Sequence, residues 1–375
     1  MGKETRVLIE FVSANPTGPL TLANARGAFV GESLARILEL YGCTVMREYY
    51  VNDRGGQINS LGHSVLKDKE AAYSGEYIDQ LSKRITETDP LEVGEKASAI
   101  VMEEMIKPVL KKIGIDFHQF FSEQSLHQTG VYKKTLELLK AKGYVYEAEG
   151  ATWLSTTRFG DDKDRVLVRS TGDETYFASD IAYHSFKIQR GYHRLINIVG
   201  ADHYTYTKQL NVVIEGILRS HYMWGGQLDW IVTQIVKLIK DGREIKMSKR
   251  AGTYVALDDV LDEVGSDVVR FFFLNKHVDT HLDFDLNLAK SNSSQNPVYY
   301  IQYAYARISS IFRQFSKNEE FELPEKIIIS HPIERQLLLR IIQFPDLVEE
   351  IAGNLEIHRL TNYAPALATD FHSQA

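Results

Sequence analysis

Residues 7–53 contain an apolar strand, a helix and a second strand in that order, and this succession limits the fold more than any other part of the chain. Residues 7–12, VLIEFV, form an apolar run with one acid, which is typical of a buried parallel strand. After the loop SANPTGP, residues 21–42 have apolar side chains at helical spacing and end in Gly42, where the helix is expected to stop. Residues 44–53, TVMREYYVND, are again β-branched and aromatic. This order predicts a βαβ unit and therefore an α/β fold on a parallel sheet.

A parallel sheet of this kind binds ligands in the loops at the carboxyl ends of its strands. In the first strand-to-helix connection these positions are Ser13, Asn15 and residues 21–26. We therefore expect them to line a pocket.

A further buried strand is expected at 195–199. It is followed by the segment Gly200-Ala201-Asp202-His203. A glycine at this point lets a ligand approach the backbone closely, and the Asp202 carboxylate can accept hydrogen bonds from ribose hydroxyls. The alternative is an ordinary strand-to-helix turn in which Asp202 caps the helix.

The segment Lys246-Met247-Ser248-Lys249-Arg250 places three cations within five residues, between an apolar run and a short β-branched run. Cations this close together suit a triphosphate, whose charge must be stabilised in the transition state. The alternative is a solvated turn that is basic by chance. Before this segment, Asp241-Gly242 is a hairpin signal, and after it Asp258 and Asp259 favour the start of a helix.

The rest of the chain predicts further units around this α/β core. Residues 116–172 contain a helix and several short strands with glycine turns, which we interpret as an insertion between the two halves of the fold. From about residue 288 the apolar spacing becomes helical. The predicted architecture is a Rossmann-like parallel-sheet domain at 1–287 with an insertion at about 116–172, followed by an incomplete all-α helical-bundle domain at 288–375.

Composition narrows the class of protein further. The chain has 375 residues and a net charge of −7, which argues against a non-specific nucleic-acid binder but allows a local basic surface. Its one cysteine, Cys43, excludes an internal disulfide and indicates a reducing compartment, so it is expected to be a small buried apolar residue. There is no long uncharged apolar run and no leader, so a cytoplasmic protein without a membrane span is expected. His118 and His127 are not at metal-ligand spacing with a cysteine, so no zinc site is predicted.

Eight segments, taken together, resemble bacterial-type arginyl-tRNA synthetases, which are class I aminoacyl-tRNA synthetases. They occur in the family's order and read EFVSANPTGPL, GAFVGESLARILE, REYYVND, GDDKDRVLVRS, TYFASDIAYH, GADHY, KMSKRAGTYV and NPVYYIQYAYARI. The resemblance implies activation of L-arginine by ATP to arginyl-adenylate, followed by transfer to the 3′ end of tRNA(Arg), without a covalent enzyme intermediate. It also implies ATP carried with Mg²⁺, no tightly bound cofactor, no metal site and a monomer.

The same resemblance makes residues 288–375 the start of an anticodon-binding domain. Tyr299, Tyr300 and Tyr303 are candidates for tRNA contact in this domain. We interpret them instead as aromatic residues of the helical core, because helical core packing is the more common reason for aromatic residues at this spacing.

The resemblance also assigns site residues. The arginine pocket would be formed by Glu10, Ser13, Asn15, Tyr176 and Asp180, which fits a guanidinium that needs acidic acceptors and an aromatic wall. Tyr176 and Asp180 are four residues apart, so on a helix they would face one pocket; a packed aromatic residue and a capping acid are the alternative. Residues expected to bind ATP are Thr21, Ala23, Asn24, Gly200, Asp202, His203, Lys246, Met247, Ser248 and Lys249, among which Lys246, Lys249, Thr21 and Asn24 would be catalytic.

The sequence departs from the family pattern in one element. Class I enzymes carry His-x-Gly-His after ANPTGPL, whereas this chain has Thr21-Leu22-Ala23-Asn24. Thr21 and Asn24 can donate neutral hydrogen bonds to phosphates but cannot be cationic. One hypothesis is a competent ligase that uses these two residues in place of the histidines. The alternative is a non-catalytic or truncated paralogue that binds arginine or ATP. The missing N-terminal additional domain and incomplete helical domain are compatible with a fragment or with a trimmed paralogue.

Overall fold

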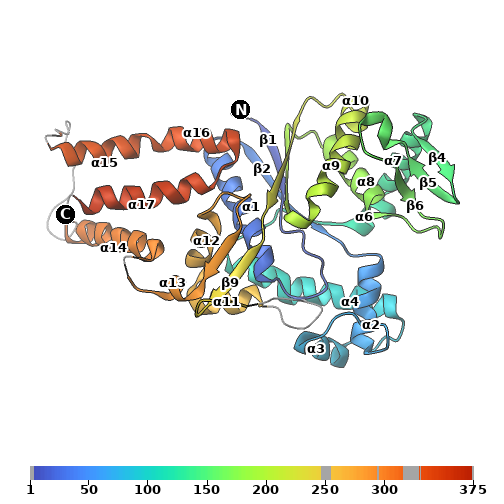
Figure 1. Ribbon diagram of the computed structural model, residues 1–375, viewed down its shortest axis with the longest axis horizontal. Helices are drawn as coiled ribbons and strands as arrows, with labels where there is room; N and C mark the ends of the chain where they lie inside the picture. The colour runs from blue at the N-terminus through green and yellow to red at the C-terminus, as the bar shows by residue number, and fades with distance from the viewer. Residues whose placement is uncertain (1–3, 246–254, 294, 316–328, 330, 374–375) are drawn as a thin grey trace.

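The computed structural model describes residues 4–245, 255–293, 295–315, 329 and 331–373. Within them, the centre is a five-stranded sheet in the order β3-β2-β1-β7-β8, with every neighbouring pair parallel (Figure 1). Its strands are β1 (Arg6–Glu10), β2 (Thr44–Val51), β3 (Gln119–Ser122), β7 (Arg194–Gly200) and β8 (Gln227–Thr233). Helix α1 (Leu22–Leu40) joins β1 to β2, which confirms the predicted βαβ unit.

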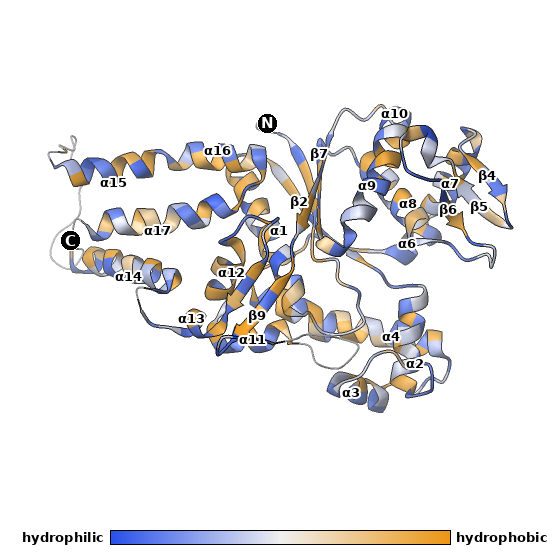
Figure 2. Cartoon of the chain, viewed as in Figure 1, coloured by the Kyte–Doolittle hydropathy of each residue, from blue (hydrophilic) through white to orange (hydrophobic). Residues whose placement is uncertain are grey.

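Alternation along the strands divides the apolar side chains between the two faces of the sheet. Val7 and Ile9 of β1 belong to the same cluster as the buried residues of α1, whereas Leu8 between them packs with α8 (Tyr176–Gln189). Successive residues of a strand point to opposite faces, so helices cover both sides of the sheet. Figure 2 shows the resulting concentration of apolar residues along the central strands. This is the Rossmann-like arrangement that the sequence predicts.

The chain between β2 and β3 is helical and forms α2 (Gly56–Leu66), α3 (Glu76–Arg84), α4 (Pro90–Val101), the π-helical turn η1 (Met102–Ile106) and α5 (Lys107–Lys112). Helix α4 starts where it does because the Asp89 carboxylate accepts hydrogen bonds from the N–H groups of Leu91 and Glu92, at 3.0 and 3.1 Å. Pro90 occupies the first helical position, where its missing N–H costs nothing.

Strand β3 is the edge strand of the main sheet, although its residues fall inside the segment 116–172. The part of that segment outside the main sheet therefore begins after Ser122. It contains α6 (Glu123–Gln128), α7 (Val131–Ala141), the 3₁₀ turn η2 (Thr156–Phe159) and an antiparallel sheet of β4 (Val145–Ala148), β5 (Ala151–Leu154) and β6 (Arg165–Val168). In Figure 1 this sheet lies at the far end of the molecule from α14–α17.

A second small sheet follows the main one, in the order β10-β9-β11. Asp241 and Gly242 connect the antiparallel strands β9 (Val236–Lys240) and β10 (Arg243–Ile245). Their φ values of 51° and 71° confirm the predicted hairpin turn. Asp258 and Asp259 lie in the first turn of α11, as predicted. The elements of this half are η3 (Ala201–His203), α9 (Tyr204–Val213), η4 (Ile214–Leu218), α10 (Arg219–His221), β9 (Val236–Lys240), β10 (Arg243–Ile245), α11 (Leu257–Val264), α12 (Ser266–Leu274), β11 (Leu282–Asp285) and α13 (Leu286–Lys290).

The described residues after 296 form α14 (Pro297–Phe315), α15 (Pro332–Ile342), α16 (Phe344–Asn354) and α17 (His358–His372). Helix α16 packs against α1, and α17 packs against α12 and α14. Arg194 at the start of β7 fixes the end of α16, because its Nη1 donates to the carbonyl oxygen of Ala352 at 2.9 Å while its Nε lies 2.5 Å from Asp229 Oδ2.

The structure tests the expectations for Cys43 and for the tyrosines of α14. Cys43 is buried and unpaired, as predicted. Tyr299 and Tyr303 are 39% and 53% exposed, so their interpretation as core residues is wrong. The rings of Tyr300 and Tyr303 instead contact His372 at the end of α17, with ring centroids 4.9 and 5.3 Å away. In the described part of the chain, no helix combines the length and apolar character needed to cross a membrane.

Close packing of α2 against α4 gives a first prediction. A Cβ added to Gly62 would lie 1.7 Å from the carbonyl oxygen of Pro90, so the two helix backbones touch at this glycine. We predict that Gly62→Ala lowers the free energy of unfolding by about 1–3 kcal/mol, measured by denaturant titration. Gly56→Ala in the same helix is the matched control, because nothing lies within 4 Å of its Cβ position. Equal stability of the two variants would contradict this contact.

Candidate active site

The candidate active site lies at the carboxyl ends of β1 and β7, which are neighbours in the main sheet. The chain leaves β1 towards β2 on one side and leaves β7 towards β8 on the other. Where connections diverge in this way, a parallel sheet leaves room for a ligand. Glu10, the last residue of β1, is in register with Asn197 of β7. The sheet therefore brings together two polar residues that are far apart in the sequence.

The turn after β1 holds Ser13 against Glu10. Val12 and Ser13 have φ values of 67° and 38°, a left-handed conformation that costs roughly 1–3 kcal/mol per non-glycine residue and is often found at functional sites. Ser13 Oγ donates to Glu10 Oε1 at 3.1 Å and accepts from the N–H of Tyr50 at 3.1 Å. Asn15 is partly buried, and its side chain forms no hydrogen bond to another described residue.

Tyr176 and Asp180 lie one turn apart at the start of α8, as their spacing predicts. Tyr176 is 48% exposed, and Asp180 is partly buried with the Tyr206 hydroxyl donating to its carboxylate. Burial raises the pKa of Asp180 to about 7, against the lowering effect of the Tyr206 hydrogen bond, and the charges of Glu10 and Glu123 raise it further. Glu10 and Asp180 are therefore close enough for the charge of one to act on the other.

Three buried polar residues that the sequence interpretation missed connect these acids. Lys187 is fully buried and forms an ion pair with Glu10, and its Nζ also donates to Asn197 Oδ1 at 2.7 Å. Asn197 contacts His184, which in turn contacts the backbone of Asp180. Lys187 follows Asp180 by seven residues on α8, so the same helical spacing that singled out Tyr176 and Asp180 could have found it.

Thr21 and Asn24 occupy the start of α1 and are bonded to each other. The backbone N–H and the hydroxyl of Thr21 both donate to Asn24 Oδ1, each at 3.0 Å. Thr21 is buried, Ala23 is exposed, and Asn24 Nδ2 has no acceptor among the described residues. In this arrangement the Asn24 amide nitrogen, and not the Thr21 hydroxyl, is the donor that faces outward.

The start of α1 also holds the chain that returns from the basic segment. Thr21 forms an antiparallel bridge with Ala256, and the N–H of Leu22 donates to the carbonyl oxygen of Val255 at 3.3 Å. The predicted residues Lys246, Met247, Ser248 and Lys249 lie outside the described residues, as does Arg250. Val255 is the first described residue after them.

Arg26 does not line the site, so the expectation for the range 21–26 is wrong at this position. Its side chain is fully buried and donates to the carbonyl oxygens of Gln234, His277 and Thr280, at 3.1, 2.8 and 2.6 Å. Arg26 lies two residues beyond Asn24, so the helix turns it towards the interior. Burial lowers its pKa to about 10, against the raising effect of Asp279.

The segment after β7 turns directly from the strand into η3. Gly200 ends the strand, and a Cβ there would lie 2.6 Å from Asp202 Oδ1. The side chains of Asp202 and His203 are 82% and 56% exposed, with the imidazole Nε2 3.6 Å from Asp202 Oδ2. Both side chains are therefore open to solvent at this end of the sheet.

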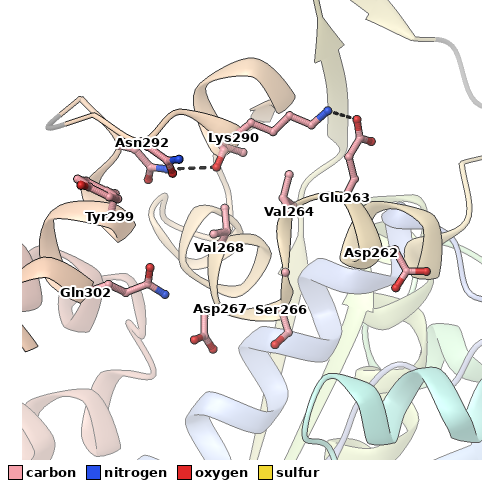
Figure 3. Close-up of a pocket in the computed structure, with 13 residues that line it drawn as sticks. Asp262, Glu263, Val264, Ser266, Asp267, Val268, Lys290, Asn292, Tyr299 and Gln302 are labelled. Carbon is pink, nitrogen blue, oxygen red and sulfur yellow. Dashed lines mark hydrogen bonds and ion pairs between the residues drawn. The ribbon is translucent and has the colours of Figure 1, made fainter. Parts of the chain in front are cut away.

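A separate cavity of about 570 Å³ lies between the α11–α12 turn, α13 and α14 (Figure 3). None of the described residues predicted to bind arginine or ATP lines it. Two of its acidic residues already have partners, since Glu263 pairs with Lys290 and Asp262 with Lys112. Tyr299 and Gln302 face it from α14.

Comparison with known families places this fold in a class. Residues 96–276 match the family described as "tRNA synthetases class I (R), catalytic domain", and residues 301–374 match the "DALR anticodon binding domain". The solved Thermus thermophilus arginyl-tRNA synthetase shares the fold, with a TM-score of 0.76 at 20% identity over 100% of this chain and 75% of that one. The fold of this protein is therefore that of a class I tRNA synthetase.

Relatives at higher identity give the family. The arginine–tRNA ligase of Desulfosudis oleivorans is 43% identical over 99% of this chain and 71% of its own length. That of Aquifex aeolicus is 40% identical over 99% of this chain and 74% of its length. A crystallised Campylobacter jejuni protein designated an arginyl-tRNA synthetase is 35% identical, with a TM-score of 0.88 over 99% of this chain and 86% of that one. This chain belongs to the arginyl-tRNA synthetase family.

The raised pKa of Asp180 gives a prediction for stability. A carboxyl group whose pKa is higher in the folded than in the unfolded protein destabilises the fold where it is ionised. This cost shrinks as the pH falls below the folded pKa of about 7 and is gone only below the unfolded pKa of about 4. We predict that Asp180→Asn raises the melting temperature of the unliganded protein at pH 8, and raises it less at pH 5. Asp283→Asn, at an exposed position of β11, is the control and should leave it unchanged. An equal increase at both pH values would contradict the assignment.

Proposed function

We propose that this protein is an arginine–tRNA ligase, which activates L-arginine with ATP to arginyl-adenylate and transfers the arginyl group to the 3′ end of tRNA(Arg). Family membership supports the reaction. The observation that supports arginine as the amino acid is that Glu10 and Asp180 are close enough for their charges to interact, with Tyr176 one turn before Asp180 on α8. Two carboxylates and an aromatic ring are suited to a substrate with a guanidinium and an ammonium group.

In this proposal Glu10, Ser13, Asn15, Tyr176 and Asp180 hold arginine. An ionised Asp180 can accept two N–H groups of the guanidinium. Because the pKa of Asp180 in the empty site is about 7, arginine binding near neutral pH would displace the proton from the fraction of molecules that hold it. Tyr176 is exposed enough to cover the bound side chain. The uncommitted side chain of Asn15 can hydrogen-bond one end of the substrate.

ATP, as its magnesium complex, is proposed to lie between the start of α1 and the segment 200–203. The arginine carboxylate attacks the α-phosphorus and pyrophosphate leaves, so the charge that builds up is on phosphate oxygens. We assign its stabilisation to Lys246 and Lys249, with Ser248 and Met247 in the same segment. Asn24 and Thr21 would contribute neutral contacts near Ala23, and Gly200, Asp202 and His203 would hold the nucleoside. The ribose hydroxyl of the terminal tRNA adenosine then attacks the arginyl carbonyl and releases AMP.

We further propose residues 1–287 as the catalytic unit, with an insertion at about 116–172, and residues 288–375 as the start of the anticodon-binding domain. The family matches at 96–276 and 301–374 support this division. Exposed Tyr299 and Tyr303 on α14 are candidates for contact with tRNA(Arg). Translation is a cytoplasmic process, and one chain carries all the residues proposed here, so we expect a cytoplasmic monomer without a tightly bound cofactor.

The arginine pocket is tested by Asp180→Asn in ATP–pyrophosphate exchange with tRNA(Arg) present. We expect the KM for arginine to rise by roughly 10²-fold or more and the KM for ATP to change little, because a charged hydrogen-bond partner is lost. In the parent protein, kcat/KM for arginine should fall about tenfold per pH unit below pH 7, as Asp180 takes up a proton. The pocket is misassigned if Asp180→Asn and the exposed control Asp283→Asn give the same KM for arginine.

The replaced histidine element is tested by the double substitution Thr21→His and Asn24→His. We expect exchange activity in the parent chain, and a kcat up to about 10²-fold higher in the double variant, because cationic donors stabilise phosphate charge more strongly. Ala23→Gly is the control for a change in the same turn without a new donor. Activity that exists only in the double variant would show that the parent is a non-catalytic binder.

A further inference from the structure

We propose that Lys187 is the positioning residue of the arginine pocket, holding Glu10 directly and Asp180 through Asn197 and His184. This inference rests on the proposed function, because it assumes that these two acids bind arginine. It assigns a role to buried residues that do not touch the substrate. It rests on four contacts, which join Lys187 to Glu10, Lys187 to Asn197, Asn197 to His184, and His184 to Asp180.

The first arm is the ion pair between Lys187 and Glu10. Lys187 is on α8 and is fully buried, whereas the Glu10 side chain is 15% exposed at the end of β1. The ammonium therefore approaches Glu10 from inside the protein and leaves the outer side of the carboxylate for a ligand. Ser13 Oγ fixes the other carboxylate oxygen at 3.1 Å. Glu10 is thus held at both oxygens before a substrate arrives.

The second arm runs from Lys187 to Asp180 and depends on the orientation of one amide. Lys187 Nζ can only donate, so it turns the oxygen of Asn197 towards itself, at 2.7 Å. The nitrogen of that amide then donates to His184 Nε2 at 3.3 Å. His184 Nδ1 must therefore carry the ring proton, and it donates to the carbonyl oxygen of Asp180 at 2.8 Å.

The environment of His184 keeps this arm in one protonation state. Burial lowers the pKa of His184 well below its usual value, and the nearby Lys187 charge lowers it further. A neutral imidazole with a fixed tautomer has one donor and one acceptor, and both are used here. The ring also lies against Trp230, with centroids 5.5 Å apart. Asp180 is therefore fixed through its backbone and, at Oδ2, by the Tyr206 hydroxyl, while no described residue donates to Oδ1.

The surroundings of Lys187 explain why a lysine is tolerated in the core. Its Nζ lies 4.1 Å from the centre of the Tyr183 ring, and Tyr183 donates to Glu48, which pairs with Arg190. The charged and titratable groups that interact with Lys187 are therefore Glu10 from β1 and Asp180, Tyr183 and His184 from α8. Burial raises the pKa of Asp180, and the charges of Glu10 and of Glu123 from α6 raise it further. The hydrogen bond from Tyr206 of α9 and the charge of Lys187 lower it. The lysine thus favours the charged form of the acid that binds arginine.

The test is Lys187→Met in the full chain, with arginine and ATP titrated separately in ATP–pyrophosphate exchange. We expect the KM for arginine to rise roughly 10–100-fold while the KM for ATP changes less than threefold, because a buried acceptor on each arm loses its donor. We also expect the pH midpoint of kcat/KM for arginine to move to higher pH, since the group that lowers the pKa of Asp180 is gone. A purely structural role would not move that midpoint.

Asn197→Leu covers the case in which Lys187→Met does not fold. It has a similar volume, leaves the ion pair with Glu10 in place and breaks only the arm to His184. We expect a smaller rise in the KM for arginine, about tenfold, with an unchanged KM for ATP. Arg190→Met is the matched control, because Arg190 is the C-cap residue of α8 and its ion pair with the buried Glu48 touches neither acid of the pocket. It should lower the melting temperature without changing the ratio of the two KM values.

The inference is overturned if Lys187→Met and Asn197→Leu leave the KM for arginine unchanged, or if arginine and ATP affinities fall together as in a general loss of structure. Failure of the proposed function gives a different result. In that case Glu10→Gln and Asp180→Asn would themselves leave arginine affinity intact. If those two variants lose arginine affinity and the Lys187 and Asn197 variants do not, only the positioning role is wrong.

Discussion

The parallel pairing of β1 with β7 is the constraint on which the site depends. It sets Glu10 opposite Asn197, and it places the starts of α1 and η3 at one edge of the sheet. A shift of one residue in this register would turn Glu10 to the other face, away from α8 and Lys187. Buried apolar residues on both faces, such as Ile9 and Leu8, keep the register fixed because a shift would expose them. The chemistry at the strand ends is therefore determined by packing in the middle of the strands.

Between the sheet and α8, the protein buries charged side chains. Glu48 and Lys187 are both fully buried, and each forms an ion pair across the layer. Burying an ion pair is often no more stabilising than burying apolar residues of the same volume. These ion pairs orient carboxylates in advance, so under the proposed function little rearrangement would be needed for a cationic substrate to bind. The raised pKa of Asp180 is the clearest sign of this compromise between stability and binding.

Local patterns in the sequence predicted the parts of the fold that depend on neighbouring residues. The βαβ unit, the Asp241-Gly242 hairpin and the placement of Tyr176 and Asp180 on one helix all follow from spacing along the chain. The partner of Lys187 is 177 residues away on another element, and no periodicity indicates such a pair. The burial of Arg26 was missed for the same reason, since its acceptors are backbone carbonyls beyond residue 233. Tyr299 was misjudged because an aromatic helix face looks the same whether or not another segment covers it.

The bridge between Thr21 and Ala256 has a consequence for how this enzyme can change by mutation. The start of α1, to which we assign contacts with ATP, is also the backbone partner of Val255 and Ala256. Under the proposed function, a substitution at Thr21 would therefore affect the proposed ATP contacts and this backbone pairing at the same time. Effects of mutations in the two segments should be non-additive, because they share these hydrogen bonds. In evolutionary terms, substitutions on the two sides of the bridge are therefore expected to be epistatic.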